Sequence, residues 1–380
     1  MNLSRIKNEF TARYETDPRV FRAPGRINLI GEHTDYNEGF VLPAAIDFAT
    51  YVAGATRDDR LIRVSSLNFE HELVSDLDGE PIQAETWAKY VQGVALILER
   101  KGFRLRGADL LIDSDVPFGV GLSSSAALEI STAFALASLS GHKVDGMEMA
   151  KIGQAAEHEF AGVRSGIMDQ FVSVHGQTGH ALLLDCRSFE WSPVSVSHAN
   201  FIICNTKAKH NLAESEYNKR RAECEDAADF FGRTSLRDVT FDEFEARSAE
   251  MPEIPRMRAR HVITENSRVL EAVKSLRSGD LTSLGSLMNE SHESLRSDFE
   301  VSCRELDLMA ELARQQKGVL GARMMGGGFG GCTINLLDDG DHRQFVEKMS
   351  ENYHRATGIV PDIYECEISG GVCEVMSVND

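Results

Sequence analysis

Short apolar runs bounded by turn residues dominate the early part of the chain and predict β-strands. Between residues 38 and 76 they include YVAGAT at 51–56 and LIRVSS at 61–66. Runs of this length that are rich in β-branched and aromatic residues are typical of strands. ADLLID at 108–113 is a further apolar run, and it stops before Pro117. Each of these segments is therefore expected to be a strand.

Apolar residues at helical spacing occur in three other segments of the same half. The first is TWAKYVQGVALILER at 86–100. The second follows three consecutive serines and has Ile130, Phe134 and Ala137 at helical spacing. The third ends at Gly176 and has Ile167, Phe171 and Val174 at this spacing. Such spacing places one face of a helix against a core. The segment after the serines has further apolar residues on either side, so it is expected to be a buried helix.

The second half of the chain mixes strands with longer and more polar helices. Strands are predicted for HALLLDC at 180–186 and FIICNT at 201–206, and helices for 213–231, 256–277 and 281–316. GVLGARMMGGGFGGCTINLL is then expected to be a glycine hinge running into a strand, and the chain ends with a helix and a strand near YECEI. Because strands and helices do not alternate strictly as βαβ units, the pattern favours an α+β fold over a doubly wound sheet.

The length and charge of the chain narrow the possibilities. For 380 residues two domains are expected, and we place them at 1–185 and 186–380. The formal net charge of −19 gives no electrostatic reason to bind nucleic acid or an anionic membrane. MNLSRIKNEF lacks an apolar signal-peptide stretch, and no apolar run of 18 residues occurs, so neither export nor membrane insertion is expected. Seven scattered cysteines without a CxxC pair indicate reduced thiols and a cytoplasmic location.

GVGLSSSAALE at 119–129 places two glycines and three serines before a predicted helix. Glycines let the backbone approach an anion closely, and the free amides and dipole of a helix start face it. The serine hydroxyls add donors, and one of them can face a magnesium ion. The loop therefore suits a phosphate group, although small residues that cap a helix at a tight packing point give the same pattern.

The standard nucleotide-binding glycine motifs do not explain this chain. It has no GxxxxGK[ST] loop, which excludes a Walker-type phosphate site. GGGFGG at 326–331 fits GxGxxG formally, but we do not expect it to follow a strand and open a helix in a βαβ unit. A flexible hinge is the simpler interpretation.

RAPGRINLIGEHTDYNEGF at 22–40 contains the densest group of functional side chains. Two Pro/Gly turns bracket Arg26, Glu32, His33, Asp35, Tyr36 and Asn37. Carboxylates accept hydrogen bonds from hydroxyl groups, and buried polar groups require partners, so this density suits a polyhydroxyl ligand. A metal site is the alternative, but a His–Asp spacing of two matches no common structural zinc pattern.

Asp169 lies in the apolar setting of GIMDQF, in the first turn of a predicted helix. There it can be merely a partner of the helix dipole. It can also be a base that the dipole and a nearby arginine keep ionised. The sequence leaves both interpretations open.

Together these segments resemble the galactokinases, within the group of galactokinases, homoserine kinases, mevalonate kinases and phosphomevalonate kinases. GRINLIGEHTDYNEGFVLPAAID resembles the galactokinase signature, PFGVGLSSSAA the phosphate loop of the group, GIMDQF its catalytic segment and MMGGGFGGCT its third motif. KHNLAESEYNKRRAEC at 209–224 is similar to a further sugar-kinase segment. The likeness spans residues 20–370, so it covers nearly the whole chain.

The resemblance implies phosphorylation of galactose by ATP at the anomeric C1 hydroxyl, which gives galactose 1-phosphate and ADP and begins galactose catabolism. Asp169 matches the position of the base, and Arg26 that of the arginine that stabilises the transferring phosphoryl group. The sugar-holding positions match Glu32, His33, Thr34, Asp35 and Tyr217, together with the backbone of Gly166.

On the nucleotide side, the resemblance implies an ATP phosphate loop and a Mg²⁺ site formed by Ser125 and Glu157. Trp87 and Tyr90 match aromatic positions near the adenine, and Ser66 is a further match on this side. The loop positions are Gly119, Val120, Gly121, Leu122, Ser123, Ser124 and Ser125.

The resemblance also implies a two-lobed small-molecule kinase fold with the active site between the lobes. The N-terminal lobe would be like domain 2 of ribosomal protein S5 and the C-terminal lobe ferredoxin-like, which agrees with the α+β pattern. A monomer is expected. The third motif commonly carries a threonine before its glycines, and Met325 stands there in this chain. If that hydroxyl helps to position phosphate or the catalytic aspartate, its loss is expected to affect the rate rather than the reaction.

Three other functions fit parts of the pattern. A kinase of a related sugar, such as N-acetylgalactosamine or arabinose, would differ in the pocket around the C2 and C5 substituents, which the sequence does not give. A non-catalytic sensor of galactose and ATP would be favoured by loss of Asp169 or of part of GLSSSAA, and both are intact. A mevalonate or homoserine kinase would share the serine loop, residues 119–125, but lack EHTDYN. A galactose kinase is therefore the expected function.

Overall fold

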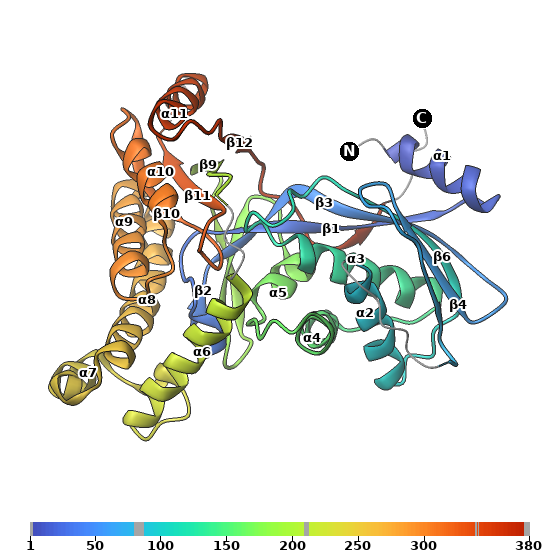
Figure 1. Cartoon of the computed structure of the whole chain (residues 1–380), viewed down its shortest axis with the longest axis horizontal. Coiled ribbons are helices and arrows are strands. Elements are labelled where there is room, and N and C mark those ends of the chain that lie inside the picture. Colours follow the sequence, from blue (N-terminus) through green and yellow to red (C-terminus); the bar gives the residue numbers. More distant parts are fainter. Residues whose placement is uncertain (1–2, 80–86, 209–212, 339, 341, 376–380) are drawn as a thin grey trace.

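Two lobes, each built on its own sheet, make up the structure (Figure 1). The computed structural model describes residues 3–79, 87–208, 213–338, 340 and 342–375. Helices and strands are mixed in both lobes, which confirms the α+β prediction. Within the described residues, no helix is both long and apolar enough to span a membrane.

The first lobe is built on a six-stranded sheet with the strand order β13-β1-β3-β6-β4-β5. Strands β4 and β6 run parallel, and every other neighbouring pair is antiparallel. Because β13 comes from the end of the chain, the C-terminal segment returns to the first lobe and pairs with β1. The strands are β1 (Arg19–Asn28), β3 (Pro43–Thr56), β4 (Leu61–Ser66), β5 (Leu73–Asp76), β6 (Ala108–Ser114) and β13 (Cys373–Glu374).

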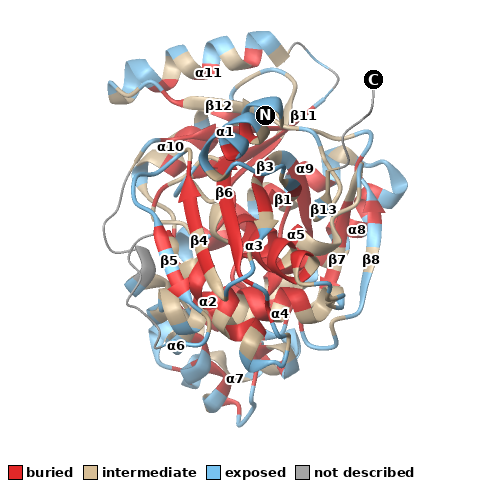
Figure 2. Ribbon diagram, turned by 90° about the vertical axis from the view of Figure 1, so that its right-hand side faces the viewer, coloured by how far each residue is buried: buried red, intermediate tan, exposed pale blue. Residues whose placement is uncertain are grey.

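The alternation of side chains along these strands determines where the helices pack. Val20 and Leu111 face α1, whereas their neighbours Phe21 and Leu110 belong to the core on the opposite side. Successive side chains of a strand point to opposite faces, so both faces are apolar and both are covered (Figures 1 and 2). The covering helices are α1 (Leu3–Tyr14) on one face and α2 (Ala88–Arg100), α3 (Ser124–Leu139), α4 (Gly146–Ala156) and α5 (Met168–His175) on the other.

The second lobe is built on an antiparallel sheet with the order β10-β11-β9-β12. Numbered along the chain, this order is 2-3-1-4, the arrangement of a ferredoxin-like fold. Helices α8 and α9 pack on one face, and α10 and α11 on the other. The elements are β9 (Asn200–Asn205), β10 (Val319–Met324), β11 (Cys332–Leu337), β12 (Asp362–Glu365), α8 (Glu253–Ser278), α9 (Leu281–Ser297), α10 (Arg304–Arg314) and α11 (His342–Thr357).

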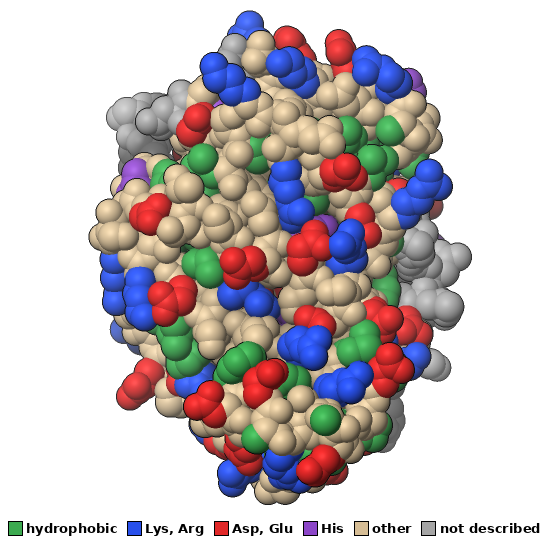
Figure 3. Space-filling model, turned by 90° about the vertical axis from the view of Figure 1, so that its left-hand side faces the viewer, with side chains coloured by type: hydrophobic (Ala, Val, Ile, Leu, Met, Phe, Trp, Pro, Cys, Tyr) green, Lys and Arg blue, Asp and Glu red, His purple; other side chains and the backbone are tan. Residues whose placement is uncertain are grey.

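Two further helices, α6 (Ala213–Phe230) and α7 (Phe241–Arg247), complete this lobe. They share a core with α8 and with the segment that joins α9 to α10. Figure 3 views the molecule from the side of α8 and α9, and it shows charged residues of both signs interspersed over that face. The hydrophobic side chains visible there occur in small, separate groups.

The lobes are joined by a shared core and a small third sheet. Residues of β1, such as Ile27, pack in one cluster with Ile203 of β9 and Ile334 of β11. The third sheet has the order β2-β7-β8, from Phe40–Val41, His180–Asp185 and Trp191–Ser195. The predicted division between residues 185 and 186 falls between β7 and β8, and it stays a prediction.

Most elements expected from the periodicity are confirmed, but the helix predicted for 281–316 is wrong. It is divided into α9 and α10 by the non-helical segment 298–303. Backbone carbonyls in the break are satisfied by buried arginines: Arg220 Nε donates to Phe299 O at 2.7 Å and Arg258 Nη1 to Asp298 O at 2.6 Å. The break places the Phe299 ring 4.8 Å from the ring of His33. Tertiary contacts therefore override a continuous helical pattern.

The glycine-rich segment leads into a strand, as expected, but it also follows one. GGGFGG does follow a strand, β10, and it leads into the strand β11, which pairs with β10 as a hairpin. It opens no helix, so it is not a dinucleotide-binding turn. The hairpin places its glycines against the serine loop, since a Cβ on Gly331 would lie 2.9 Å from Val120 O.

Candidate active site

A cavity of about 150 Å³ lies where the two lobes meet. Strand β1, the loop after it, helices α5 and α6 and the glycine hairpin all contribute to its wall. The structure thus brings together eight of the sequence-predicted site residues. The lining residues are Arg26, Glu32, His33, Asp35, Glu157, Val163, Ser165, Gly166, Met168, Asp169, Tyr217, Gly326 and Gly327.

Arg26 and Asp169 form a bidentate ion pair in the wall of this cavity. Arg26 Nε and Nη2 each lie 2.8 Å from one carboxylate oxygen of Asp169. Arg26 is 4% exposed, whereas the Asp169 side chain keeps 28% of its surface. The Asp169 carboxylate is therefore accessible to a ligand, while the buried Arg26 guanidinium binds it from the protein side. A two-bonded pair of this kind fixes both groups in orientation as well as in charge.

The position of Arg26 is set by a close approach of β1 to the serine loop. Arg26 N donates to Leu122 O at 3.0 Å, and the pairing of β1 with β3 shifts register between Pro24 and Arg26. A Cβ on Gly25 would lie 2.6 Å from Leu122 O. Only glycine permits this approach, so the bulge at Gly25 turns Arg26 toward Asp169.

The serine loop has the backbone of an anion site. Gly119 and Gly121 have φ values of +70° and +86°, and Ser123, before the first turn of α3, has φ +59°. A non-glycine residue in this region is strained, and such strain is often found at functional sites. The first amides of α3 have no partner within the helix, so they are available to a phosphate.

Two of the three serine hydroxyls have protein partners. Ser123 Oγ donates to Asp169 Oδ2, and Ser125 Oγ donates to Glu157 Oε1 at 3.2 Å. Leu122 contributes its carbonyl while its side chain is buried in the core shared by the lobes. The loop is therefore connected to both carboxylates on which the predicted chemistry depends.

Glu157 begins a π-helical turn, Glu157–Ala161, that extends α4. Ser165 Oγ and Gln170 Nε2 donate to its Oε2, the latter at 3.1 Å. Burial raises the pKa of Glu157, and these donors oppose the rise. A cation near this carboxylate would offset its desolvation.

The described residues contain no group of three or more His, Cys, Asp or Glu side chains that could hold a metal. One serine and one carboxylate nevertheless suit Mg²⁺, which usually keeps several waters and takes its remaining ligands from substrate phosphates. The pair Ser125 and Glu157 therefore fits the predicted ion.

Glu32 is bound on both oxygens by the protein itself. Arg323 Nη2 and Asn28 Nδ2 donate to Oε2, the latter at 2.8 Å, and Gly326 N donates to Oε1 at 3.0 Å. Burial raises the pKa of Glu32, and Arg323 opposes this effect. Arg323 is fully buried and also donates to Asn28 O and Leu29 O. It thus connects the glycine hairpin to the end of β1, a role that the sequence did not reveal.

The loop after β1 holds His33 in a left-handed conformation, with φ +62°. Asn37 Nδ2 donates to His33 O at 2.8 Å, and Thr34 Oγ1 donates to Gly31 O and Phe40 O at 2.9 and 2.7 Å. Thr34 is fully buried and does not line the cavity. Of the predicted sugar-binding residues, it is the one that the structure places behind the wall, where it braces the loop.

Asp35 and Gly166 lie next to each other in the cavity wall. A Cβ on Gly166 would lie 2.0 Å from Asp35 Oδ2, so any larger residue would displace this carboxylate. Burial, followed by the nearby charge of Asp169, raises the pKa of Asp35 to about 6. The Tyr217 ring closes this side of the cavity, 5.3 Å from the ring of His33. Asp35 is thus a poorly solvated acceptor that a hydroxyl group would satisfy.

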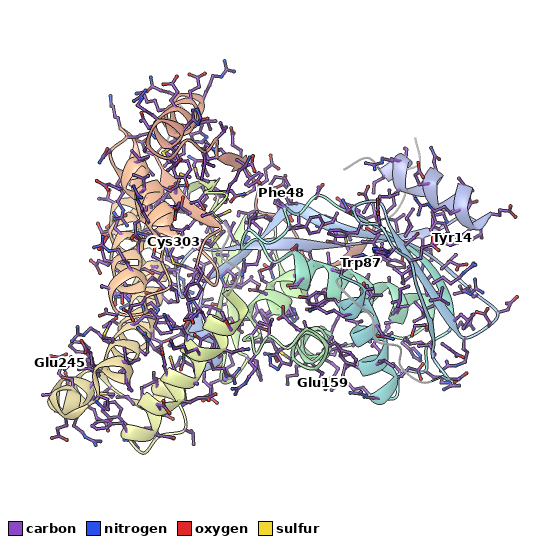
Figure 4. All side chains as sticks on the ribbon, in the orientation of Figure 1. Tyr14, Phe48, Trp87, Glu159, Glu245 and Cys303 are labelled. Atoms are coloured by element: carbon purple, nitrogen blue, oxygen red, sulfur yellow. The ribbon has the colours of Figure 1, made fainter. Side chains whose placement is uncertain are left out.

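Ser66, Trp87 and Tyr90 do not line this cavity. Trp87 lies in the first lobe (Figure 4), with its ring 6.3 Å from that of Phe69 and nearly parallel to it. The Phe69 ring lies 4.7 Å from the ring of Phe118, which directly precedes the glycines of the loop. Phe69 and Phe118 are 39% and 46% exposed, and Trp87 Nε1 is buried without a partner in the described structure. Two exposed aromatic rings thus adjoin the serine loop.

Sequence reasoning missed Phe69 and Phe118, and it placed Ser66 near the nucleotide without a reason. Ser66 Oγ accepts from Asn68 N and Phe69 N at 3.0 and 3.3 Å, so it shapes the turn that presents Phe69. Phe118 directly precedes the glycines of the loop, so its position in the chain was a usable signal. Phe69 had no such signal.

Met325 is buried in the core shared by the lobes and does not line the cavity. Its sulfur accepts from Asn28 N at 3.3 Å, and its own N donates to Cys332 O at 3.0 Å. Its side chain therefore stabilises the junction between the hairpin and β1. Its effect on turnover stays a prediction.

Comparisons with known proteins agree with this geometry. Family models match a galactokinase galactose-binding signature at residues 8–56, a GHMP kinase N-terminal domain at 89–177 and a GHMP kinase C-terminal domain at 272–355. A galactokinase of Roseiflexus sp. is 43% identical, covering 99% of this chain and 98% of its own. One of Glaesserella parasuis is 45% identical, covering 98% of both chains.

The structural comparisons give the same picture. The crystal structure of Lactococcus lactis galactokinase complexed with galactose superimposes with a TM-score of 0.93, at 36% identity, over 98% of this chain and 100% of that one. The Methanococcus jannaschii mevalonate kinase superimposes with a TM-score of 0.64 at 18% identity, covering 93% of this chain and 99% of that one. The second likeness shows the fold alone, and it confirms the predicted two-lobed kinase fold.

Proposed function

Since the chain belongs to the galactokinase family, we propose that its cavity is the place where galactose is phosphorylated by ATP. The product is galactose 1-phosphate, formed at the anomeric C1 hydroxyl, together with ADP. The observation that carries this proposal is the Arg26–Asp169 pair, which stands between the polar cavity and the serine loop. A sugar in the cavity and a phosphate on the loop would meet at this pair.

The cavity wall supplies both acceptors and donors for sugar hydroxyls. Asp35 offers carboxylate oxygens in a poorly solvated position, and His33 presents a buried Nε2 without a partner in the described structure. Glu32 also lines the cavity, but its oxygens already accept from the protein, so its main effect is to hold the loop and the hairpin together. Tyr217 and Gly166 limit the width of the pocket.

Asp169 is suited to accept the proton of the C1 hydroxyl. As the sugar oxygen forms its bond to the γ-phosphorus, the bond from that phosphorus to the β-bridging oxygen breaks and ADP leaves. Phosphoryl transfer depends mainly on positioning and on stabilisation of charge. Arg26 supplies a fixed cation beside the reacting groups, and Ser123 holds the carboxylate in place.

ATP is proposed to lie along the serine loop, with its adenine against the exposed rings of Phe69 and Phe118 and the buried Trp87 packed beside Phe69. The amides that begin α3 would bind the phosphates. Ser125 and Glu157 would hold Mg²⁺, which when bound neutralises phosphate charge. Tyr90, also matched to the adenine side, packs partly buried against the core cluster that contains Trp87.

We further propose that the protein is a cytoplasmic monomer. All seven cysteines lie within the described residues, and none forms a disulfide, which suits a reducing compartment. The interspersed charges of the face in Figure 3 do not resemble an obligate interface. The charge of −19 argues against nucleic acid or an anionic membrane as a partner.

ADP release from Mg·ATP tests the function, with galactose, N-acetylgalactosamine, glucose, arabinose and mevalonate as acceptors. We expect strong turnover on galactose alone. Turnover only on another sugar would keep the mechanism and overturn the specificity. Galactose binding without turnover would indicate the sensor.

Replacement of Asp169 by asparagine tests the base. It keeps the shape of the pair, and turnover should fall by about 10²–10⁴-fold while galactose binding, measured by calorimetry, survives. Asp280→Asn is the control, because Asp280 caps the distant α9. Turnover of Asp169→Asn within tenfold of wild type would refute the assignment.

A further inference from the structure

Tyr36 makes a direct contact with the imidazole of His33 on the side away from the cavity. The Tyr36 hydroxyl lies 2.7 Å from His33 Nδ1. His33 lines the cavity and is only 5% exposed, and its other ring nitrogen, Nε2, is buried with no hydrogen-bond partner among the described residues. A buried nitrogen without a partner in a polar cavity needs one from a ligand.

The His33 ring carries one proton rather than two. Burial, followed by the nearby His261, lowers the pKa of His33 to about 3, so the imidazole is neutral at working pH. Burial raises the pKa of Tyr36 well above its usual value, so the phenol keeps its hydrogen. The position of the single imidazole proton therefore decides whether Nε2 donates or accepts.

Counting hydrogen bonds distinguishes the two tautomers. With the proton on Nε2, the Tyr36 hydroxyl donates to Nδ1, and only Nε2–H waits for a ligand. With the proton on Nδ1, the Tyr36 oxygen accepts from Nδ1–H instead. The Tyr36 hydroxyl hydrogen and the Nε2 lone pair then both lack partners. Leaving a buried polar group unsatisfied costs about 1–3 kcal/mol, so the first tautomer is favoured.

We propose that Tyr36 is a positioning residue that fixes the tautomer of His33, so that Nε2–H donates into the cavity. The sugar hydroxyl that faces His33 is then recognised as an acceptor, whereas a hydroxyl that faces Asp35 is recognised as a donor. The cavity wall thus distinguishes a sugar hydroxyl that accepts a hydrogen bond from one that donates it. This inference rests on the proposal that the cavity binds a sugar.

Deoxy- and deoxyfluoro-galactoses, modified in turn at C2, C3, C4 and C6, separate the two roles. Fluorine accepts a hydrogen bond weakly and cannot donate one. At the position that faces His33, kcat/KM for the fluoro sugar should exceed that for the deoxy sugar by about tenfold. At a position that faces Asp35, both analogues should be equally poor.

Tyr36→Phe keeps the ring and removes the donor. The tenfold fluoro advantage at the His33 position should disappear, while the ratios at the other positions stay as in the wild type. A retained advantage in Tyr36→Phe would overturn the proposal, as would the lack of a fluoro advantage at every position of the wild type. His33→Phe, which leaves a ring without a donor, should abolish the advantage as well, which identifies the position.

The tautomer itself is measured by the imidazole ¹⁵N shifts of the sugar-free wild type, with the His33 signals assigned from their loss in His33→Gln. We expect Nε2 to be protonated and Nδ1 to be bare in the wild type, and a mixture in Tyr36→Phe. Protonated Nδ1 in the wild type would refute the inference even if Tyr36→Phe failed to fold. Protonated Nε2 in a protein that turns over no galactose would instead leave the inference standing and refute the proposed function.

Discussion

Replacing Gly166 by alanine should damage the sugar site while leaving the nucleotide site intact. A Cβ at this position would lie 2.0 Å from Asp35 Oδ2 and 2.1 Å from Cγ. The backbone of Gly166 is not in a left-handed conformation, so alanine brings no dihedral strain of its own. The carboxylate must therefore move by more than about 1 Å to regain van der Waals distance.

The size of the effect follows from what Asp35 is proposed to bind. A hydrogen bond to a charged group contributes about 1.5–3 kcal/mol, and 1.4 kcal/mol corresponds to about tenfold in binding. Losing one such bond to a sugar hydroxyl and weakening a second should raise KM for galactose by about 10²-fold. The KM for ATP should stay within about twofold of wild type, because no predicted nucleotide contact involves Asp35.

Initial rates at varied galactose and ATP give both constants. Gly162→Ala is the matched control on the same loop: its φ is +79°, but a Cβ there meets nothing within 4 Å, so it should strain the loop without raising KM. Asp35→Ala makes room for the new methyl, so the double variant with Gly166→Ala should be no worse than Asp35→Ala alone. A wild-type KM in Gly166→Ala, or fully additive effects in the double variant, would refute the reasoning.

Three further outcomes are expected. The kcat/KM for galactose should fall as the pH drops through about 6, because the pKa of Asp35, raised by burial and by Asp169, lets that carboxylate take up a proton and lose its acceptor; an acid limb near pH 6 that persists in Asp35→Asn would contradict this. Phe69→Ala should raise KM for ATP by about tenfold without changing KM for galactose, whereas Val74→Ala, which alters another exposed apolar residue on the nearby β5, should change neither. Glu157→Gln should weaken Mg²⁺ binding to the ATP complex by at least about tenfold, as followed by calorimetry with a non-hydrolysable ATP analogue, and unchanged affinity would remove Glu157 from the metal site.

Local patterns along the chain predicted local structure well. The apolar run 61–66 coincides with β4, and the buried segment after the serines is α3. These elements follow from side-chain periodicity, because the alternation of a strand and the turn of a helix each place a repeating set of residues on one face. The continuous pattern over 281–316 failed, since its break depends on Arg220 and Arg258, which come from other helices.

The sequence also predicted those parts of the candidate site whose residues are contiguous in the chain. The glycines and serines at 119–125 and the polar cluster at 22–40 are contiguous, so their density was visible. Their resemblance to a family then suggested partners elsewhere. What the resemblance did not give was the bracing of the loop by Thr34, the hydrogen bonds that hold Glu32 in place or the exposed ring of Phe69 beside the serine loop.

The sequence by itself determined the type of many segments, the chemistry suggested for the two local motifs and the family that the whole resembles. The tertiary structure decided which of these segments meet. Arg26 and Asp169 are 143 residues apart, and Arg323 and Glu32 are 291 apart, yet each pair is in direct contact. Such pairing depends on how the faces of two sheets and their helices pack together, and this is a property of the shared core rather than of any local run of residues. The geometry of the site depends on the packing of both lobes against that core. This packing places Asp169 against the buried Arg26 and Asp35 against Gly166.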